Sequence, residues 1–113
     1  MIEATIRNYL EEKLKLPVYL EHEKIMPDKY IMIERTGGGM SDKLMNATLA
    51  VQSIAPSMYN AALLNDEVKK AMLFELPGTN NVASCKLNSD YNFTDTETKQ
   101  YRYQAVFYLV HYE

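Results

Sequence analysis

The sequence predicts an α+β fold, with a mostly antiparallel or mixed β-sheet and two α-helices packed on one face. Two segments repeat apolar residues at helical spacing, and five others alternate or concentrate them as strands do. The strands follow one another in runs instead of alternating regularly with helices, which is typical of α+β proteins. The 113 residues, of which 47% are hydrophobic and 24% charged, suit one folded domain over residues 1–113.

The first predicted element is an amphipathic helix near the N-terminus. Apolar residues recur at three- and four-residue steps from Ile2 to Leu14, and charged residues lie between them. Pro17 should end this helix, because proline cannot continue the backbone hydrogen bonding of a helix. A short strand over residues 18–20 follows.

Two further strands come next. Residues 30–35, YIMIER, fit a strand, and the RTGGGMSDK that begins at Arg35 reads as a flexible loop. In residues 44–53, LMNATLAVQS, apolar and polar side chains alternate, so this segment predicts a strand with one buried face.

The second predicted helix covers residues 57–75. Apolar residues keep helical spacing through it, and Ser57 is a suitable N-cap. Its length should be about 28 Å, at about 1.5 Å per residue. The LPGTNN that begins at Leu76 should end it.

Two strands and a polar loop complete the predicted order, which is α-β-β-β-α-β-β. The strands cover residues 82–87 and 100–112, and the loop covers residues 88–99. The last strand holds four of the nine tyrosines and should extend about 40 Å, against a radius of gyration near 13 Å for about 100 residues. Either it bends at a bulge, or part of it meets a neighbouring molecule, or it lies at the sheet centre with both faces covered.

Charge and hydropathy exclude several classes of protein. The net charge is -3 and the basic residues are scattered, so we expect no direct sequence-specific binding to nucleic acid. No apolar run reaches the length of a membrane span, and the charged N-terminal segment does not resemble a signal peptide. We therefore expect no membrane association. Cys85 is the only cysteine, which excludes an internal disulfide and suits a reducing compartment.

No pattern of residues predicts catalysis, a metal or a cofactor. The glycine run from Gly37 to Gly39 lacks the spacing of phosphate-binding loops, and the segment after it reads as a strand. His22 and His111 are far apart in the chain, and no G-x-S-x-G motif is present. We expect a protein without enzymatic activity that uses no metal and no cofactor.

Three stretches together point to a family: YIMIERTGGG, ATLAVQSIAPSMYNAALLNDEVKKAM and LNSDYNFTDTETKQYRYQAVFYLVHY. They resemble the small tail-terminator, or tail-completion, proteins of long-tailed bacteriophages and prophages of Gram-positive bacteria, often labelled minor tail or minor capsid proteins. The resemblance covers residues 17–112 in the same order. Its most specific part is NSDYNFTDTETKQYRYQAVF.

The resemblance implies a structural subunit without catalytic residues. Such subunits assemble as a ring, commonly a hexamer, that caps the tail tube and joins it to the head. The implied partners are copies of the chain itself, the tail tube protein and head–tail connector proteins. The implied location is the bacterial cytoplasm during assembly and then the virion. The residues implied at subunit or tube contacts are Gly37, Gly38, Gly39, Asp90, Asn92, Phe93, Thr94, Asp95, Glu97, Tyr101 and Tyr103.

Two other functions stay open on the sequence. One is a neck or head-completion protein, a head–tail connector built on a similar scaffold. The other is a small ligand-binding α+β module that would use the tyrosine-rich face of the sheet together with His111.

Overall fold

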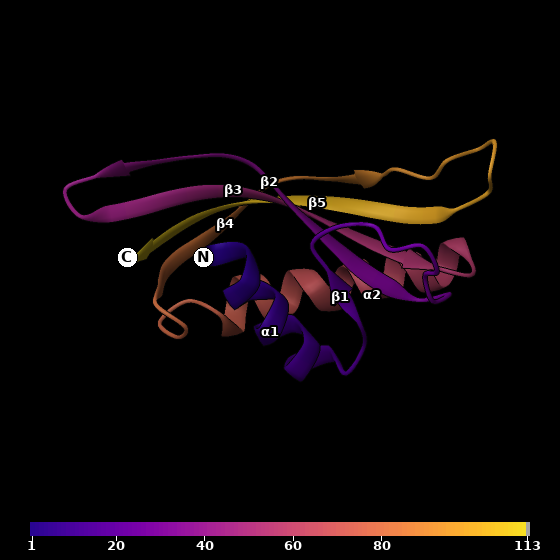
Figure 1. The fold of residues 1–113 in the computed structure, drawn as a ribbon, viewed down its shortest axis with the longest axis horizontal. Coiled ribbons are helices and arrows are strands. Elements are labelled where there is room, and N and C mark those ends of the chain that lie inside the picture. Colours follow the sequence, from indigo (N-terminus) through magenta and orange to yellow (C-terminus); the bar gives the residue numbers. More distant parts are fainter. Residues whose placement is uncertain (113) are drawn as a thin grey trace.

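The computed structural model describes residues 1–112 and shows the predicted α+β fold, a five-stranded sheet with the helices on one face (Figure 1). The elements are α1 (Ile2–Leu14), β1 (Val18–Tyr19), β2 (Tyr30–Ser41), β3 (Leu44–Ala55), α2 (Met58–Lys70), the π-helical turn η1 (Ala71–Glu75), β4 (Val82–Asn92) and β5 (Tyr101–Tyr112). The strand order across the sheet is β1-β2-β3-β5-β4. β1 runs parallel to β2 and the other neighbouring pairs are antiparallel. The sheet is therefore mixed, and the predicted order of elements is confirmed.

The helix α1 ends before Pro17, as predicted. Lys15 follows the helix in the left-handed conformation with φ of 57°, and its N–H donates to the carbonyl of Glu11 at 3.0 Å. The Glu11 side chain accepts a hydrogen bond from the N–H of Val18 at 3.2 Å. These bonds tie the end of α1 to the first strand.

β2 continues well beyond Arg35, where the glycine run predicted a flexible loop. It pairs with β3 as far as Ser41, with one bulge between Arg35 and Gly37. The connecting residues, Asp42 and Lys43, have positive φ angles of 50° and 68°, which a two-residue type I′ turn requires. The loop prediction was wrong because glycines weaken a strand without preventing it when a cross-strand partner supplies the hydrogen bonds.

Residues 58–75 form one continuous helical segment, α2 followed by η1, so the helix predicted over residues 57–75 is confirmed except that Ser57 is its N-cap. The Ser57 side chain accepts a hydrogen bond from the N–H of Asn60 at 3.1 Å and caps α2. Periodicity alone did not reveal the final π turn.

The π turn changes which side chains face the core. The N–H of Leu76 donates to the carbonyl of Ala71, five residues earlier, at 3.0 Å. The extra residue rotates the following positions by about 100° relative to an uninterrupted α-helix. Leu76 is fully buried, while Phe74 is 80% exposed.

β4 is longer than predicted, because it covers residues 82–92 and not only 82–87. Its register against β5 shifts twice, between Val82 and Ser84 and between Leu87 and Ser89. Each shift is a bulge that resets the inward and outward alternation. For this reason the sequence predicted a loop from residue 88 onward, whereas residues 89–92 pair with β5.

β5 lies between β3 and β4 and pairs with both. Its pairing with β3 runs from Tyr101 to Tyr112 without a register shift. The long strand thus neither bends at a bulge against β3 nor leaves the sheet. The helices cover one face of β5 (Figure 1). Within residues 1–112, no second layer covers its other face.

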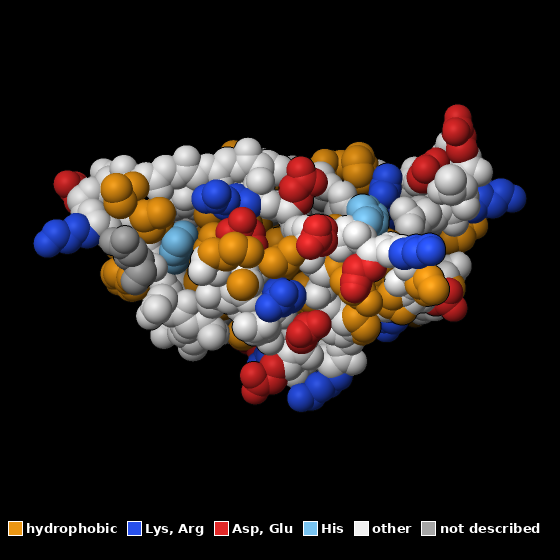
Figure 2. Space-filling view, in the orientation of Figure 1, with side chains coloured by type: hydrophobic (Ala, Val, Ile, Leu, Met, Phe, Trp, Pro, Cys, Tyr) orange, Lys and Arg blue, Asp and Glu red, His pale blue; other side chains and the backbone are white. Residues whose placement is uncertain are grey.

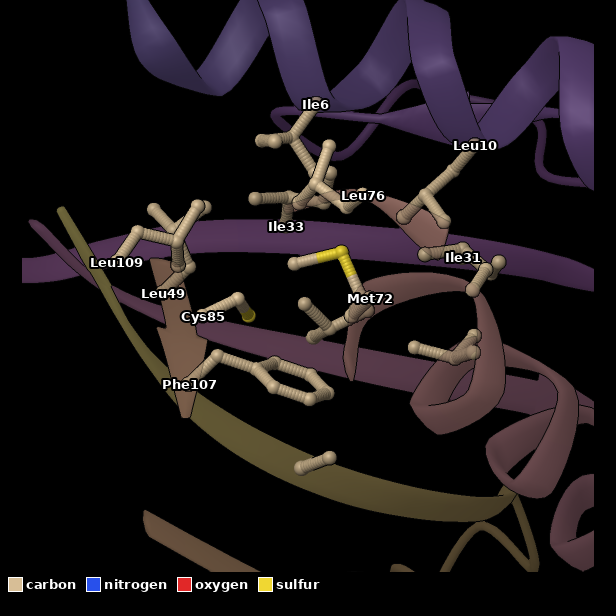
Figure 3. Packing of buried hydrophobic residues seen from close by; sticks show 14 of the residues in the cluster. Ile6, Leu10, Ile31, Ile33, Leu49, Met72, Leu76, Cys85, Phe107 and Leu109 are labelled. Carbon is tan, nitrogen blue, oxygen red and sulfur yellow. The ribbon is translucent and has the colours of Figure 1, made fainter. Parts of the chain in front are cut away.

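The main hydrophobic core fills the space between the helices and the sheet (Figure 3). Side chains from α1, β2, β3, η1, β4 and β5 meet there, among them Ile6, Leu10, Ile31, Ile33, Leu49, Met72, Cys85, Phe107 and Leu109. A smaller cluster, Tyr30, Met32 and Ile54, lies elsewhere, with Tyr19 and Met26 packed against it. By strand alternation these three residues are on the face opposite the helices, so only that end of the second face is covered.

The molecule is elongated, with principal extents of 45 × 25 × 23 Å. Figure 1 shows the β2–β3 hairpin reaching out at one end of the long axis and the loop between β4 and β5 at the other end.

Candidate functional site

Two long strand edges of the sheet have no strand partner within residues 1–112. β1 covers β2 only at Ile31 and Met32, so the outer edge of β2 is open over residues 34–41. β4 is the outermost strand on the opposite side and pairs only with β5. Unpaired backbone N–H and C=O groups along such edges are able to bind a strand of another chain.

The glycine arm, defined here as residues 35–49 of the β2–β3 hairpin, presents the first open edge. The side chains of β2 are exposed from Glu34 onward. A Cβ atom at Gly38 would lie 2.8 Å from the backbone carbonyl oxygen of Asn46, whereas one at Gly37 would meet only the Thr48 side chain at 3.7 Å. Glycine at position 38 thus permits the close approach of the two strands.

The tip loop, defined here as residues 93–100, follows the second open edge. The Asn92 side chain accepts from the N–H of Thr94 at 2.9 Å, and the Asp95 side chain accepts from the N–H groups of Glu97 at 3.0 Å and Thr98 at 3.4 Å. These are Asx turns. An isolated bridge between Asp95 and Gln100 closes the loop.

Phe93 lies at the start of the tip loop in an aromatic cluster. Its ring meets the Tyr91 ring edge-to-face, with centroids 5.8 Å apart. The Arg102 guanidinium lies 4.6 Å from the Phe93 centroid, and its Nε donates to the Phe93 carbonyl at 2.7 Å. Phe93 is nevertheless 40% exposed, so it is held in place and still accessible.

Asp90 has a different position from the other predicted contact residues. Its carboxylate accepts a hydrogen bond from the Asn65 side chain at 2.6 Å and forms an ion pair with Lys69, both on α2. The hydrogen bond to Asp90 raises the pKa of Lys69 above its usual value. This network joins α2 to β4 within one chain, so Asp90 stabilises the fold.

Tyr101 and Tyr103 are half-buried and lie on the helix-facing side of the sheet, opposite Ala55 and Ser53 of β3. Phe93 and Arg102 lie on the other face by strand alternation. The structure therefore does not bring Tyr101 and Tyr103 together with Phe93, although all three were predicted contact residues.

The open face, defined as the side of the sheet away from the helices, carries exposed aromatic residues that the sequence did not single out. Tyr108 and Tyr112 of β5 are 51% and 55% exposed there. Gln104 accepts from Gln52 at 2.9 Å and donates to the Tyr91 hydroxyl. Strict alternation with the buried residues of β5 would have identified these outward tyrosines.

A cavity of about 430 Å³ lies near the N-terminus of α1, at the base of the glycine arm. Residues from distant parts of the chain line it, including Glu3, Arg35, Asn80, His111 and Tyr112. Arg35 Nε lies 3.5 Å from Glu3 Oε2. His111 is nine-tenths buried and is on the helix side of β5, so it does not share the open face with Tyr108.

Two features of residues 1–112 bear on possible chemistry, namely clusters of metal ligands and the single thiol. No group of three or more His, Cys, Asp or Glu side chains in residues 1–112 is arranged to hold a metal ion. Burial raises the pKa of the Cys85 thiol to about 12, so this group is a poor nucleophile at neutral pH. Neither of the described helices has the length and apolar character needed to cross a membrane.

No protein-family model matches the chain, and no curated protein matches it.

Proposed function

We propose that this chain is a structural assembly subunit of a long-tailed bacteriophage, a tail terminator that forms a closed ring on the end of the tail tube and joins it to the head. The observation that carries the proposal is the pair of long open edges on opposite sides of one sheet. The resemblance of residues 17–112 to tail-terminator proteins supports the phage tail as the place where the chain assembles.

The two open edges are suited to a head-to-tail contact. β2 and β4 run antiparallel within one chain, because β3 and β5 lie between them and each neighbouring pair is antiparallel. In a second copy rotated about an axis along the strands, β4 runs antiparallel to β2 of the first. The contact uses different surfaces on its two sides, and such heterologous contacts form rings when the rotation closes.

The composition of the edges also favours association. β2 lacks proline and places three glycines in its open half, so few side chains obstruct an approaching strand. β4 carries two bulges, which limit uncontrolled pairing. An edge that is partly protected suits one specific partner better than open-ended aggregation.

In this proposal the partners are other copies of the chain, the tail tube protein and the head–tail connector. The ring is a hexamer by resemblance, and it assembles in the bacterial cytoplasm before it becomes part of the virion. A neck protein on a similar scaffold would use the same edges. Capture by connectors and not by tubes would identify that role.

The first test is the solution mass by light scattering across protein concentration, with and without isolated tail tubes. A discrete ring mass, alone or induced by tubes, is the expected result. Hydrogen exchange should then slow in residues 34–41 and 82–92 on assembly, because their outer amides gain partners.

An edge variant makes the test specific. Asn88 is the unpaired residue at the second bulge of β4, so Asn88→Pro should leave the monomer folded and block pairing with a neighbour. Lys70→Glu, on the exposed side of α2, is the matched control and should assemble normally. A ring that forms equally well with Asn88→Pro and shows unchanged exchange at both edges would refute edge pairing.

A further inference from the structure

The two open edges of the sheet each carry one charged side chain on the open face. Glu34 lies on β2, in the part that β1 leaves open, and Lys86 lies on β4. Strand alternation and the pairing with β3 and β5 place both on the side away from the helices. The other open-face side chains of β2 and β4 are uncharged. One edge is therefore acidic on this face and the other is basic.

The two charges do not meet within one chain. β3 and β5 lie between β2 and β4, so Glu34 and Lys86 are three strand spacings apart, about 14 Å at about 4.8 Å each. Both residues are exposed, and no ion pair among residues 1–112 includes either of them. Each charge is therefore available to a group of another molecule.

Glu34 and Lys86 lie at nearly the same height along the strands. Glu34 is level with Val106 of β5 through Ala50 of β3, and Lys86 pairs with Tyr108 of β5. Val106 and Tyr108 are separated by a step of two residues, so the two heights differ by about 7 Å at about 3.4 Å per residue. Rotation about an axis along the strands leaves these heights unchanged.

The neighbouring copy in such a ring brings the two residues within reach of each other. Lys86 of the next copy lies on the strand beside β2, at a lateral spacing of about 4.8 Å and about 7 Å along the strand from Glu34. The two residues are diagonal cross-strand neighbours, a geometry that long side chains are able to span.

The backbone of both edges is oriented for this pairing. The N–H of Ile31 donates to the carbonyl of Pro17, on the outer side of β2, at 3.0 Å. Ile31 belongs to the core on the helix side, so helix-side residues of β2 direct their backbone groups outward. Alternation across the three antiparallel pairs gives the same result for β4. Pairing of the edges thus keeps the helices of both copies on one side and both charges on the open face.

We propose that Glu34 of one copy forms an ion pair with Lys86 of the next copy, on the open face of a sheet that continues from chain to chain. The partner at each edge is thus the opposite edge of a second copy of this chain. This inference rests on the proposed ring and adds the charge pair that favours its direction and register.

The charge pair favours the head-to-tail contact over a closed dimer. An edge that pairs with the same edge of another copy meets no opposite charge on this face, whereas β2 against β4 does. Acidic and basic side chains are interspersed over the side of the molecule shown in Figure 2, so no broad area of one charge orients approaching copies there. Specificity then depends on charges placed at the contact itself.

Charge reversal tests the ion pair. Glu34→Lys and Lys86→Glu each place like charges at every contact of a ring, so each variant alone should associate about fivefold to tenfold more weakly per contact. Light scattering across protein concentration measures this loss, with tail tubes present if the wild type requires them. The loss should nearly disappear at about 1 M salt, where the screening length is about 3 Å.

Mixing the two variants makes the test specific. In a ring where they alternate, the lysine introduced at position 34 meets the glutamate introduced at position 86, and the unchanged Glu34 meets the unchanged Lys86. A 1:1 mixture should therefore regain assembly in a ring with an even number of copies, such as a hexamer. The double variant, with both reversals in one chain, should regain assembly whatever the number of copies.

Glu67→Lys and Lys70→Glu are matched controls with the same changes of charge. Both residues are exposed on α2, which packs on the central strands β3 and β5 and not on the edges. These variants should assemble normally, alone and mixed. Thermal unfolding of each monomer verifies that the fold persists.

The outcomes separate the ion pair from the ring. Single reversals without effect, or a loss that neither the mixture nor the double variant restores, would overturn the ion pair while leaving the ring itself intact. A wild-type chain that remains monomeric at every concentration, with and without tubes, would overturn both the ion pair and the proposed function.

Discussion

At the scale of single residues, Gly38 has the narrowest tolerance in the glycine arm. Gly38→Ala should destabilise the hairpin by about 1–3 kcal/mol, because the new Cβ would lie 2.8 Å from the Asn46 carbonyl oxygen. Hydrogen exchange in the arm should accelerate, and ring formation should weaken. Gly37→Ala is the matched control, since its Cβ would approach nothing closer than 3.7 Å. Equal behaviour of the two variants would contradict the close approach at Gly38.

Cys85 offers a second prediction at this scale. Burial raises the pKa of its thiol from 9.0 to about 12, so at neutral pH its thiolate fraction is about a thousandfold lower than in the unfolded chain. A disulfide reagent should label the folded protein only as fast as it opens. The double variant Cys85→Ala, Lys86→Cys moves the thiol to an exposed position and should react at once. Rapid labelling of folded wild-type protein would show that Cys85 is not buried.

At the scale of elements, the π turn η1, which continues α2, makes the polar contacts to α1. The Tyr9 hydroxyl of α1 donates to the Ala71 carbonyl at 2.8 Å, the same carbonyl that accepts from Leu76. An ion pair between Lys13 and Glu75 lies beside it. The Ala71 carbonyl at the start of the π turn thus accepts from two donors, and one of these bonds ties α1 to the helical segment that follows α2.

Tyr9→Phe should therefore lower the free energy of unfolding by about 0.5–1.5 kcal/mol, the usual value for one hydrogen bond. Urea denaturation measures this change. Tyr59→Phe is a suitable control, because Tyr59 is 73% exposed and the loss of its hydroxyl should have almost no effect. If both variants unfold at the same urea concentration as the wild type, the hydroxyl of Tyr9 contributes nothing to the helix contact.

At the scale of the whole molecule, stability should decline at alkaline pH. Burial raises the pKa values of Cys85, Tyr9 and Tyr30, and the hydrogen bond to Asp90 raises that of Lys69. The folded state then holds more protons than the unfolded state once pH exceeds the unfolded pKa values. The free energy of unfolding decreases with rising pH under that condition.

The decline should begin near pH 9.0, the ordinary pKa of the thiol, and steepen as the tyrosines and Lys69 begin to titrate in the unfolded chain. Urea denaturation between neutral pH and about pH 10 measures it, with a slope of at most about 1.4 kcal/mol per pH unit for each proton. Cys85→Ala should show a shallower decline at the start of this range. An identical curve for the variant would exclude the thiol as a source.

Apolar periodicity predicted α1, the helical segment 57–75 and the central strand β5, because these elements bury one continuous face. It did not reveal the distal halves of β2 and β4. Their side chains are solvent-exposed, and bulges interrupt the alternation, so cross-strand pairing alone defines them.

The candidate site divides in the same way. The glycine arm and the tip loop each lie in one stretch of sequence, so the resemblance was able to suggest them as contact regions, and this role stays a prediction. The cavity could not be predicted from the sequence, because Glu3, Arg35, Asn80 and His111 come from four separate segments that only the tertiary fold brings together. The contact of Asp90 with α2 could not be predicted from the sequence either, because Asn65 and Lys69 follow ordinary helical spacing.

The central position of β5 also bears on how the chain folds during synthesis. β3 and β4 both pair with β5, yet β5 leaves the ribosome after them. Until then the earlier segments expose strand edges and most of the apolar surface that β5 later covers, a state in which new chains tend to aggregate. The sheet is completed in a late step that depends on contacts between residues far apart in sequence, which are slow to form. In the proposed ring, folding of each chain would therefore precede association and would limit how many copies are able to assemble.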